Sequence, residues 1–206
     1  MISEISLLPA VFLDRDGVLI EYRENYIRQW SDVVFYSNAL KALAALRDMP
    51  CRLIIITNQS AVGRGLITIK DAIDINDRIV SMVEQAGGRL DAVYMCPHKP
   101  EDNCTCRKPK PGMIFQAAEK YIVDLKHSVI IGDSLSDLEA GRAAGIQHRY
   151  LVRTGRGTRE GASISGVGID KISVVDDLAQ AISHHFERKF SDRKAQPNRL
   201  ADNNLV

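Results

Sequence analysis

The chain is poor in cysteine and has no long apolar run. Its 206 residues include 4 cysteines, too few and too unevenly spaced for the disulfide framework of a small secreted protein. No apolar stretch reaches the roughly 20 residues that a membrane-spanning helix needs. Residues 1–8 contain Glu4 and lack a basic stretch followed by an apolar core, so they do not resemble a secretory signal. We therefore expect a cytoplasmic protein.

The chain also lacks an excess of either charge. Lysine and arginine total 27 and aspartate and glutamate total 26, for a net charge of +1 at pH 7. This balance gives no general attraction to nucleic acid or to a membrane surface. The 45% hydrophobic content is that of an ordinary globular protein. We expect a monomer that binds neither nucleic acid nor a membrane.

Short apolar runs alternate with segments of helical spacing along the chain. The runs predict buried strands at residues 9–13, 52–58, 91–95, 128–133, 148–152 and 172–175. Between them lie helical patterns, among them one that Thr68 begins and Gly87 ends. The alternation predicts an α/β fold, a Rossmann-like and mainly parallel sheet with helices on both faces. No insertion is long enough for a large cap domain.

The segments outside these elements carry weaker signals. Residues 60–66 contain Gly63 and Gly65 and predict a mobile connection, and the glycine-rich stretch 153–168 predicts a loop. From Ser191 to Val206 the chain is polar and unpatterned, which predicts a disordered tail. The expected organisation is one domain over residues 1–190 and a tail over residues 191–206.

Two carboxylates follow the first predicted strand. Asp14 and Asp16 stand on either side of Arg15, and Gly17 then marks a turn. Ligands of open α/β sheets bind beyond such strand ends, and paired carboxylates suit Mg²⁺ or an attack on phosphorus. A calcium-binding loop does not fit, because Gly17 comes two positions too early for its pattern. A receiver-type acidic cluster and a plain surface turn are the alternatives.

Two other predicted strands also end in polar groups. Thr57 and Asn58 close the second strand, and Asp133 closes the fourth. If these strands are neighbours in one parallel sheet, their ends meet at one edge, where a third carboxylate completes a Mg²⁺ site. Lys108 supplies a cation after the third strand. Each residue has an ordinary structural explanation, but their occurrence together in this order favours a site.

These positions together resemble the motifs of the haloacid dehalogenase superfamily of phosphotransferases. The matching stretches are Asp14-x-Asp16-Gly17, Thr57-Asn58, Lys108 and Gly132-Asp133, and the likeness extends from about residue 9 to residue 153. Val18 stands where that family normally has threonine, a change that leaves the carboxylates in place.

The resemblance implies covalent catalysis. Asp14 would attack phosphorus and become an aspartyl phosphate, and Asp16 would act as general acid and then general base. The catalytic Mg²⁺ would be bound by Asp14, Asp133 and the main-chain carbonyl of Asp16.

The resemblance also implies the groups that hold the transferring oxygens. These are Thr57, Lys108 and main-chain amides near Arg15 and Asn58. Asp137 has two interpretations: support of the metal, or a carboxylate in the first turn of a helix, where negative charge is favourable. We favour the second interpretation.

A loop after the third strand contains three of the cysteines. Cys96, His98, Cys104 and Cys106 make a compact set of soft ligands, a complete tetrahedral shell for structural Zn²⁺. A disulfide between Cys104 and Cys106 would close a very tight ring in a reducing compartment, and a redox pair is similarly disfavoured. Zinc would order this loop and the phosphate-binding residues beside it. Cys51 lies apart, in a buried strand, and is expected to pack.

Two groups of the superfamily carry a similar loop, the bacterial heptose bisphosphate phosphatases and the histidinol phosphate phosphatases. The spacing between His98 and Cys104 resembles the histidinol type. Four other stretches resemble the heptose type: 25–27, 57–60 with 64–65, 106–113 and 151–155. We give them more weight because loop length drifts easily. Ser134 departs from the heptose group, which commonly has lysine there.

The resemblance implies a small phosphorylated metabolite, a sugar bisphosphate, as the partner. A second phosphate needs a second anion site, for which Arg107 is a candidate. The candidate contacts to sugar or phosphate are Arg15, Arg23, Asn25, Tyr26, Thr57, Asn58, Gln59, Ser60, Arg107 and Lys108. Arg23 and Tyr26 equally fit an ordinary solvated loop.

The activity that the resemblance implies, and that we expect, is Mg²⁺-dependent removal of the 7-phosphate of D-glycero-D-manno-heptose 1,7-bisphosphate, in the supply of bacterial heptose for lipopolysaccharide. The alternatives are a histidinol-phosphate phosphatase, a broader phosphatase of small metabolites and a non-catalytic, zinc-stabilised phosphate-binding scaffold. Asp14 and Asp16 argue against the scaffold, because a protein without catalysis has no chemical need for both.

Overall fold

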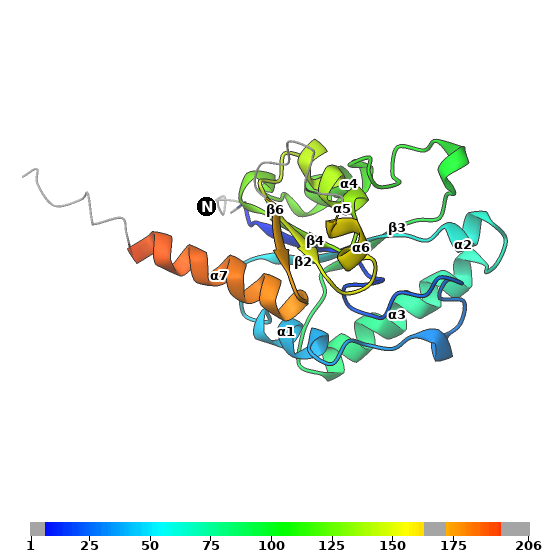
Figure 1. The fold of residues 1–206 in the computed structure, drawn as a ribbon, viewed down its shortest axis with the longest axis horizontal. Helices are drawn as coiled ribbons and strands as arrows, with labels where there is room; N and C mark the ends of the chain where they lie inside the picture. The colour runs from blue at the N-terminus through cyan, green and yellow to red at the C-terminus, as the bar shows by residue number, and fades with distance from the viewer. Residues whose placement is uncertain (1–6, 163–171, 195–206) are drawn as a thin grey trace, which may run out of the picture.

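The chain folds around one six-stranded sheet in the computed structural model, which describes residues 7–162 and 172–194. The strands are β1 (Ala10–Leu13), β2 (Arg52–Asn58), β3 (Ala92–Cys96), β4 (Val129–Gly132), β5 (His148–Val152) and β6 (Ile172–Val175). They lie in the order β3-β2-β1-β4-β5-β6, and every neighbouring pair is parallel. The predicted α/β fold is confirmed (Figure 1).

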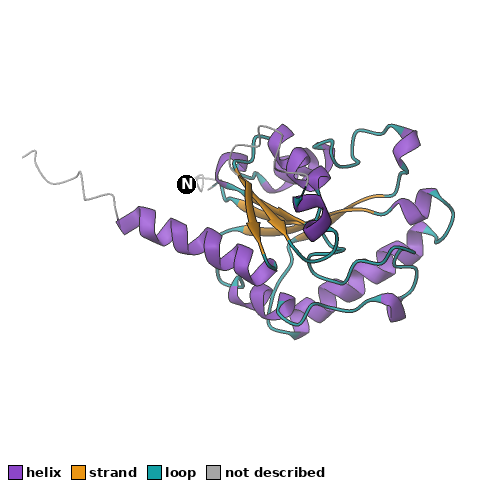
Figure 2. Ribbon diagram, viewed as in Figure 1, coloured by secondary structure: helices purple, strands orange, loops and turns teal. Residues whose placement is uncertain are grey.

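Helices cover both faces of the sheet (Figure 2). One face carries α1 (Ala39–Ala45), α3 (Ile69–Gln85) and α7 (Leu178–Lys194), and the other carries α4 (Gly112–Tyr121) and α5 (Leu135–Ala143). Short helices α2 (Ser60–Gly63) and α6 (Gly157–Gly161) and the 3₁₀ turns Trp30–Asp32, Pro100–Asp102 and Leu125–His127 lie in the connections. In the described part of the chain, no helix has both the length and the apolar composition for crossing a membrane.

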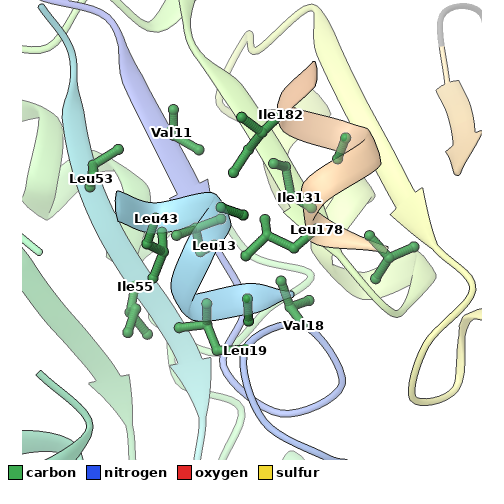
Figure 3. Packing of buried hydrophobic residues seen from close by; sticks show 14 of the residues in the cluster. Val11, Leu13, Val18, Leu19, Leu43, Leu53, Ile55, Ile131, Leu178 and Ile182 are labelled. Carbon is green, nitrogen blue, oxygen red and sulfur yellow. The ribbon is translucent and has the colours of Figure 1, made fainter. Parts of the chain in front are cut away.

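The core forms two layers because successive strand residues point to opposite faces of the sheet. The layer under α1 and α7 includes Val11, Leu13, Leu53, Ile55, Leu43, Leu178 and Ile182 (Figure 3). The layer under α4 includes Phe12, Ile54, Ile56, Met113 and Ile114. Strands β1, β2 and β4 are therefore buried on both faces, which is why their sequences are continuous apolar runs.

Three segments are more regular than their composition predicts. Residues 60–66, expected to be a mobile connection, contain α2, where Ala61 is buried and the Gly63 amide donates to the Pro97 carbonyl at 2.9 Å. The predicted loop 153–168 contains α6, and residues 163–168 lie outside the described residues. Helix α7 continues to Lys194, past the predicted start of the tail at Ser191, because helix propagation is cooperative. Residues 195–206 lie outside the described residues.

The strand order changes direction at β1: β2 and β3 lie on one side of it, and β4, β5 and β6 lie on the other. In open α/β sheets a crevice forms beyond the strand ends at such a switch point. Asp14 follows β1 there and Asp133 follows β4, and the Asp14 amide donates to the Ile131 carbonyl at 3.0 Å. The topology thus places two of the predicted site carboxylates side by side.

Candidate active site

The first strand ends in a turn that depends on Gly17. Its φ of +85° is a left-handed conformation that residues with a side chain rarely adopt, and a Cβ there would lie 2.2 Å from Asp133 Oδ2. The backbone of this turn therefore touches the carboxylate that follows β4. Asp14 and Asp133 are both buried, at 5% and 0% exposure.

Three buried carboxylates gather at this edge of the sheet. Asp14, Asp133 and Asp137 offer oxygens that lie within 4.8 Å of one another. Lys108 Nζ is buried beside them, 2.9 Å from Asp14 Oδ1 and 2.6 Å from Asp137 Oδ1. Arg156 pairs with Asp133, its Nη2 lying 3.1 Å from Oδ1. Among the described residues, two paired cations thus face three carboxylates.

The excess of carboxylates over cations shifts the pKa values of the cluster. Burial raises the pKa of Asp14 to about 7; the ion pair with Lys108 lowers it, and the charges of Asp137 and Asp133 add to the rise. Burial and Asp137 raise the pKa of Asp133 as well, against the effect of Arg156. Burial opposes the charge of Lys108, but Asp137 and Asp14 raise its pKa above the usual value.

The donor set fits a hard divalent cation such as Mg²⁺. All three side chains offer carboxylate oxygens, and a bound cation would favour the ionised forms of Asp14 and Asp133, which burial and the neighbouring carboxylates otherwise disfavour. Asp14 and Asp133 are two of the predicted ligands. The third carboxylate beside them is Asp137, not the side chain of Asp16.

Asp137 lies in the first turn of α5 and also in the acidic cluster. Its Oδ2 accepts hydrogen bonds from the Ser134 amide at 3.1 Å and the Ser134 hydroxyl at 2.7 Å, at the first turn of α5. Its Oδ1 faces Lys108 in the acidic cluster. The predicted place in the first turn of the helix is confirmed, and support of the metal stays a prediction. Gly132 makes room for this side chain, since a Cβ there would lie 2.3 Å from Asp137 Cβ.

Asp16 lies on the other side of the turn, paired with its neighbour. Arg15 donates from Nε to Asp16 Oδ2 and from Nη2 to Asp16 Oδ1, both at 3.1 Å. The Arg15 side chain is 1% exposed and does not line the cavity described below, so it is not placed to meet a phosphate. Its main-chain amide donates to Asp14 Oδ1 at 2.8 Å.

The predicted phosphate-binding residues at the end of β2 are tied to the loop that carries Lys108. Asn58 Nδ2 donates to the Lys108 carbonyl and the Lys108 amide donates to Asn58 Oδ1, both at 3.1 Å. Thr57 Oγ1 accepts a hydrogen bond from Gln59 Nε2 at 2.8 Å. The Asn58 side chain thus holds Lys108 beside Asp14.

A cavity of about 480 Å³ opens at this edge of the sheet. The predicted site residues that line it are Asp14, Asp16, Arg23, Tyr26, Thr57, Asn58, Gln59, Ser60, Arg107 and Lys108. Asn25 lies in an adjoining hollow that shares Arg23 and Tyr26 with the cavity. The cavity therefore brings together most of the predicted sugar and phosphate contacts.

Some cavity residues belong to none of the motifs found in the sequence, among them Tyr22, Ser136 and Arg156. Arg156 donates from its main-chain amide to Asp133 Oδ2 at 2.9 Å, and its guanidinium lies 5.2 Å from the centre of the Tyr22 ring. The one sequence signal that points to Arg156 as a site residue is its position just past the carboxyl end of β5.

The predicted zinc ligands converge where β3 ends. Cys106 Sγ lies 3.3 Å from Cys96 Sγ, 3.4 Å from Cys104 Sγ and 3.4 Å from His98 Nδ1. Cys96 Sγ lies 3.6 Å from both Cys104 Sγ and His98 Nδ1. Tetrahedral zinc has sulfur ligands about 3.8 Å apart, so this spacing fits the ion. Cys104 and Cys106 form no disulfide bond.

The cysteine loop is joined to the cavity wall. Arg107 Nη1 donates to the His98 carbonyl at 3.1 Å, and the Gln59 amide donates to the Cys96 carbonyl at 2.8 Å. A Cβ at Gly63 would lie 2.8 Å from the Pro97 carbonyl, so α2 packs closely on the same loop. The hydrogen bonds from the cysteine loop therefore help to fix the positions of the cavity residues Gln59 and Arg107.

Comparison with known proteins identifies the superfamily of this chain. The family model described as HAD-hydrolase-like matches residues 105–181. A protein of Photorhabdus laumondii named D-glycero-alpha-D-manno-heptose-1,7-bisphosphate 7-phosphatase is 38% identical over 160 residues, 74% of this chain and 87% of that protein. The chain belongs to the haloacid dehalogenase superfamily.

Other members of the haloacid dehalogenase superfamily extend the likeness to nearly the whole chain. The Bordetella bronchiseptica protein named D-glycero-beta-D-manno-heptose-1,7-bisphosphate 7-phosphatase is 36% identical over 178 residues, 84% of this chain and 99% of that protein. The crystal structure of D,D-heptose 1,7-bisphosphate phosphatase from B. bronchiseptica, complexed with magnesium and phosphate, has a TM-score of 0.82 and 35% identity, covering 88% of this chain and 99% of that chain. The superfamily predicted from the sequence is confirmed.

Proposed function

We propose that the protein is a Mg²⁺-dependent phosphatase that removes the 7-phosphate of D-glycero-D-manno-heptose 1,7-bisphosphate. The observation that carries the proposal is the cluster of Asp14, Asp133 and Asp137 beside Lys108 and a cavity, in a chain whose named relatives are heptose bisphosphate phosphatases. The relatives favour this substrate over histidinol phosphate.

Asp14 is the nucleophile of the proposed reaction. Its carboxylate bonds to phosphorus while the bond from phosphorus to the sugar oxygen breaks. Asp16, as the carboxylic acid, gives its proton to the departing oxygen; as the carboxylate it then takes a proton from the water that cleaves the aspartyl phosphate. Lys108 and Thr57 line the cavity where they can donate to the phosphoryl oxygens.

Asp14, Asp133 and the main-chain carbonyl of Asp16 would hold the Mg²⁺, with Asp137 next to them. Bound Mg²⁺ neutralises charge on the phosphoryl oxygens. For the second phosphate we assign Arg107, which lines the cavity beyond Lys108, and for the sugar Arg23, Asn25 and Tyr26.

Steady-state kinetics test the assignment of the substrate. We expect kcat/KM for heptose 1,7-bisphosphate to exceed that for histidinol phosphate by about 100-fold or more. Both anomers are assayed, because relatives with alpha and beta names match at 38% and 37% identity. A preference for histidinol phosphate would reassign the substrate. Absence of turnover on any phosphate monoester, in protein with normal zinc content, would favour the non-catalytic scaffold.

The proposal includes a structural Zn²⁺ bound by Cys96, His98, Cys104 and Cys106. Four ligands complete a tetrahedral shell and leave no open position for catalysis, so the ion would act by ordering the loop. This role is supported by the hydrogen bonds that connect the loop to Gln59 and Arg107.

Replacing Cys104 by serine is expected to remove the zinc and loosen the loop. Zinc content, measured by atomic absorption, should fall from about one ion per chain to near zero, because a hydroxyl is a poor ligand for Zn²⁺. Cys51→Ser is the matched control: it changes a buried cysteine outside the cluster and should retain the metal. Full zinc content in Cys104→Ser would contradict the ligand set.

Two further parts of the proposal concern the setting of the enzyme: it works in the cytoplasm and as a monomer. The four cysteines form no disulfide bond, which fits a reducing compartment and supports the first. Cell fractionation and light scattering after size exclusion test the two statements separately.

A further inference from the structure

A buried arginine, Arg15, lies in the turn that follows β1, between Asp14 and Asp16. Arg15 uses Nε and Nη2 to bind both oxygens of Asp16, each at 3.1 Å, and Nη1 to bind Asn76 Oδ1 at 2.7 Å. A guanidinium that engages a carboxylate through two parallel hydrogen bonds fixes its plane as well as its position. At 1% exposure, Arg15 has no surface left for a substrate.

Asn76 is an unusual residue for its place in the fold. It lies 5% exposed on α3, among the inward-facing residues Ala72, Ile75, Ile79 and Val83. Asparagine is a weak helix former, and a buried amide is destabilising unless it is hydrogen-bonded. The hydrogen bond from Arg15 offsets this burial, together with a hydrogen bond from Asn76 Nδ2 to Met95 Sδ at 3.6 Å. Asn76 does not line the cavity, so it acts through Arg15.

Asp16 is also held from the opposite side. Gln59 Nε2 donates to Asp16 Oδ2 and to Thr57 Oγ1, each at 2.8 Å. The side chains of Asn76, Arg15, Asp16, Gln59 and Thr57 thus form one hydrogen-bonded chain from the inner face of α3 to the cavity. Asp16 is the carboxylate of this chain of side chains, and it lines the cavity with 21% of its side chain exposed.

We propose that Arg15 and Asn76 are positioning residues for the general acid Asp16: Asn76 holds the Arg15 guanidinium, and the guanidinium holds the Asp16 carboxyl group toward the departing oxygen. The proposal rests on the phosphatase function proposed above. In the first step, the bond from Asp14 to phosphorus forms, the bond from phosphorus to the leaving oxygen breaks, and the Asp16 proton moves to that oxygen.

The demand for this proton depends on the leaving group. A sugar alkoxide is a poor leaving group and needs the proton, whereas p-nitrophenolate is stable enough to leave without it. Misplacement of Asp16 should therefore slow the first step with a sugar phosphate far more than with p-nitrophenyl phosphate. A general loss of folding would slow both substrates alike.

The test measures leaving-group release in the first turnover, by rapid quench, so that only phosphoryl transfer to Asp14 is observed. For Asn76→Leu, which removes the acceptor at similar volume, we expect release from heptose bisphosphate to slow about tenfold or more. Release of p-nitrophenol should stay within about twofold of the wild type. Asn76→Asp keeps an acceptor for Arg15 and should restore most of the rate with heptose bisphosphate.

Ile79→Ala is the matched control, a cavity-forming change on the same buried face of α3 with no hydrogen bond to Arg15. It should lower stability and leave the ratio of the two release rates unchanged. Equal slowing of both substrates in Asn76→Leu, or no slowing of either, would overturn the positioning role. Failure of the proposed function is seen separately, as a wild-type protein that releases no phosphate from any monoester.

Discussion

Replacing Asp14 by asparagine is expected to abolish Mg²⁺-dependent phosphate release, with kcat lowered about 10⁴-fold or more. An amide is a far weaker nucleophile than a carboxylate, and the aspartyl phosphate cannot form without the carboxylate. The exchange keeps the size of a side chain that is 5% exposed. The measurement combines steady-state phosphate release with trapping of the phosphoenzyme from radiolabelled substrate, which should yield none.

Unfolding measurements separate this loss of chemistry from a loss of fold. Burial raises the pKa of Asp14 from 3.8 to about 7 in the metal-free protein. Because the folded-state pKa is the higher one, the stability that this group contributes is full below pH 3.8 and is lost as the pH rises to about 7. Asparagine avoids that loss, so Asp14→Asn should be no less stable than the wild type near pH 8 without Mg²⁺.

The matched control is Asp77→Asn, which neutralises an exposed aspartate on α3 and should leave kcat unchanged. A folded Asp14→Asn variant that retains more than about 1% of wild-type turnover would remove Asp14 from the role of nucleophile.

The convergence of Asp14 and Asp133 could be predicted because it follows from local signals. Each residue comes directly after a short run that is apolar at every position, and such runs form parallel strands buried on both faces. The carboxyl ends of parallel strands share one edge. The pattern of strand and turn therefore located this half of the site without any knowledge of distant contacts.

The role of the Arg15 side chain could not be predicted in the same way. Its sequence neighbours, Asp14 and Asp16, suggest a phosphate-binding group, but its direction is set by Asn76, 61 residues further along the chain. Asn76 interrupts the apolar face of α3 with no sign of its partner. Long-range hydrogen bonds between buried side chains leave no periodicity that a sequence pattern can detect.

Asp137 and Arg156 show a second limit of sequence patterns. The position of Asp137 at the first turn of α5 is enough to explain an aspartate there. The sequence therefore gives no reason to expect its contact with Lys108. Arg156 lies in a glycine-rich stretch expected to be plain loop, yet it binds Asp133. In both cases the contact joins segments that are far apart in the sequence, and no local pattern predicts it.

Replacing Lys108 by methionine is expected to lower the free energy of unfolding by about 3–5 kcal/mol without Mg²⁺ near pH 8. Lys108 is 3% exposed and pairs with Asp14 at 2.9 Å and Asp137 at 2.6 Å. Methionine fills the same space without a charge. Asp14 and Asp137 then stay buried next to each other without the cation that paired with both. Urea unfolding followed by circular dichroism measures the change, and kcat should also fall about 10²-fold or more.

The charges of Asp14 and Asp137 determine how the lost stability of Lys108→Met can be restored. Mg²⁺ should stabilise Lys108→Met more than it stabilises the wild type, because the ion then replaces the positive charge that Lys108 places beside Asp14 and Asp137. Acidification from about pH 8 to about pH 6 should also restore stability. The reason is that the pKa of Asp14, already raised to about 7, rises further once the lowering effect of Lys108 is gone.

The matched control for this prediction is Lys110→Met, the same exchange two residues further along the same loop. Lys110 is exposed, and its Nζ donates to the Asn103 carbonyl at 3.0 Å. Its loss should change the free energy of unfolding by less than about 0.5 kcal/mol, with no dependence on Mg²⁺. If Lys108→Met were as stable as the wild type near pH 8 without Mg²⁺, charge balance with Lys108 would not be what holds the buried carboxylates in place.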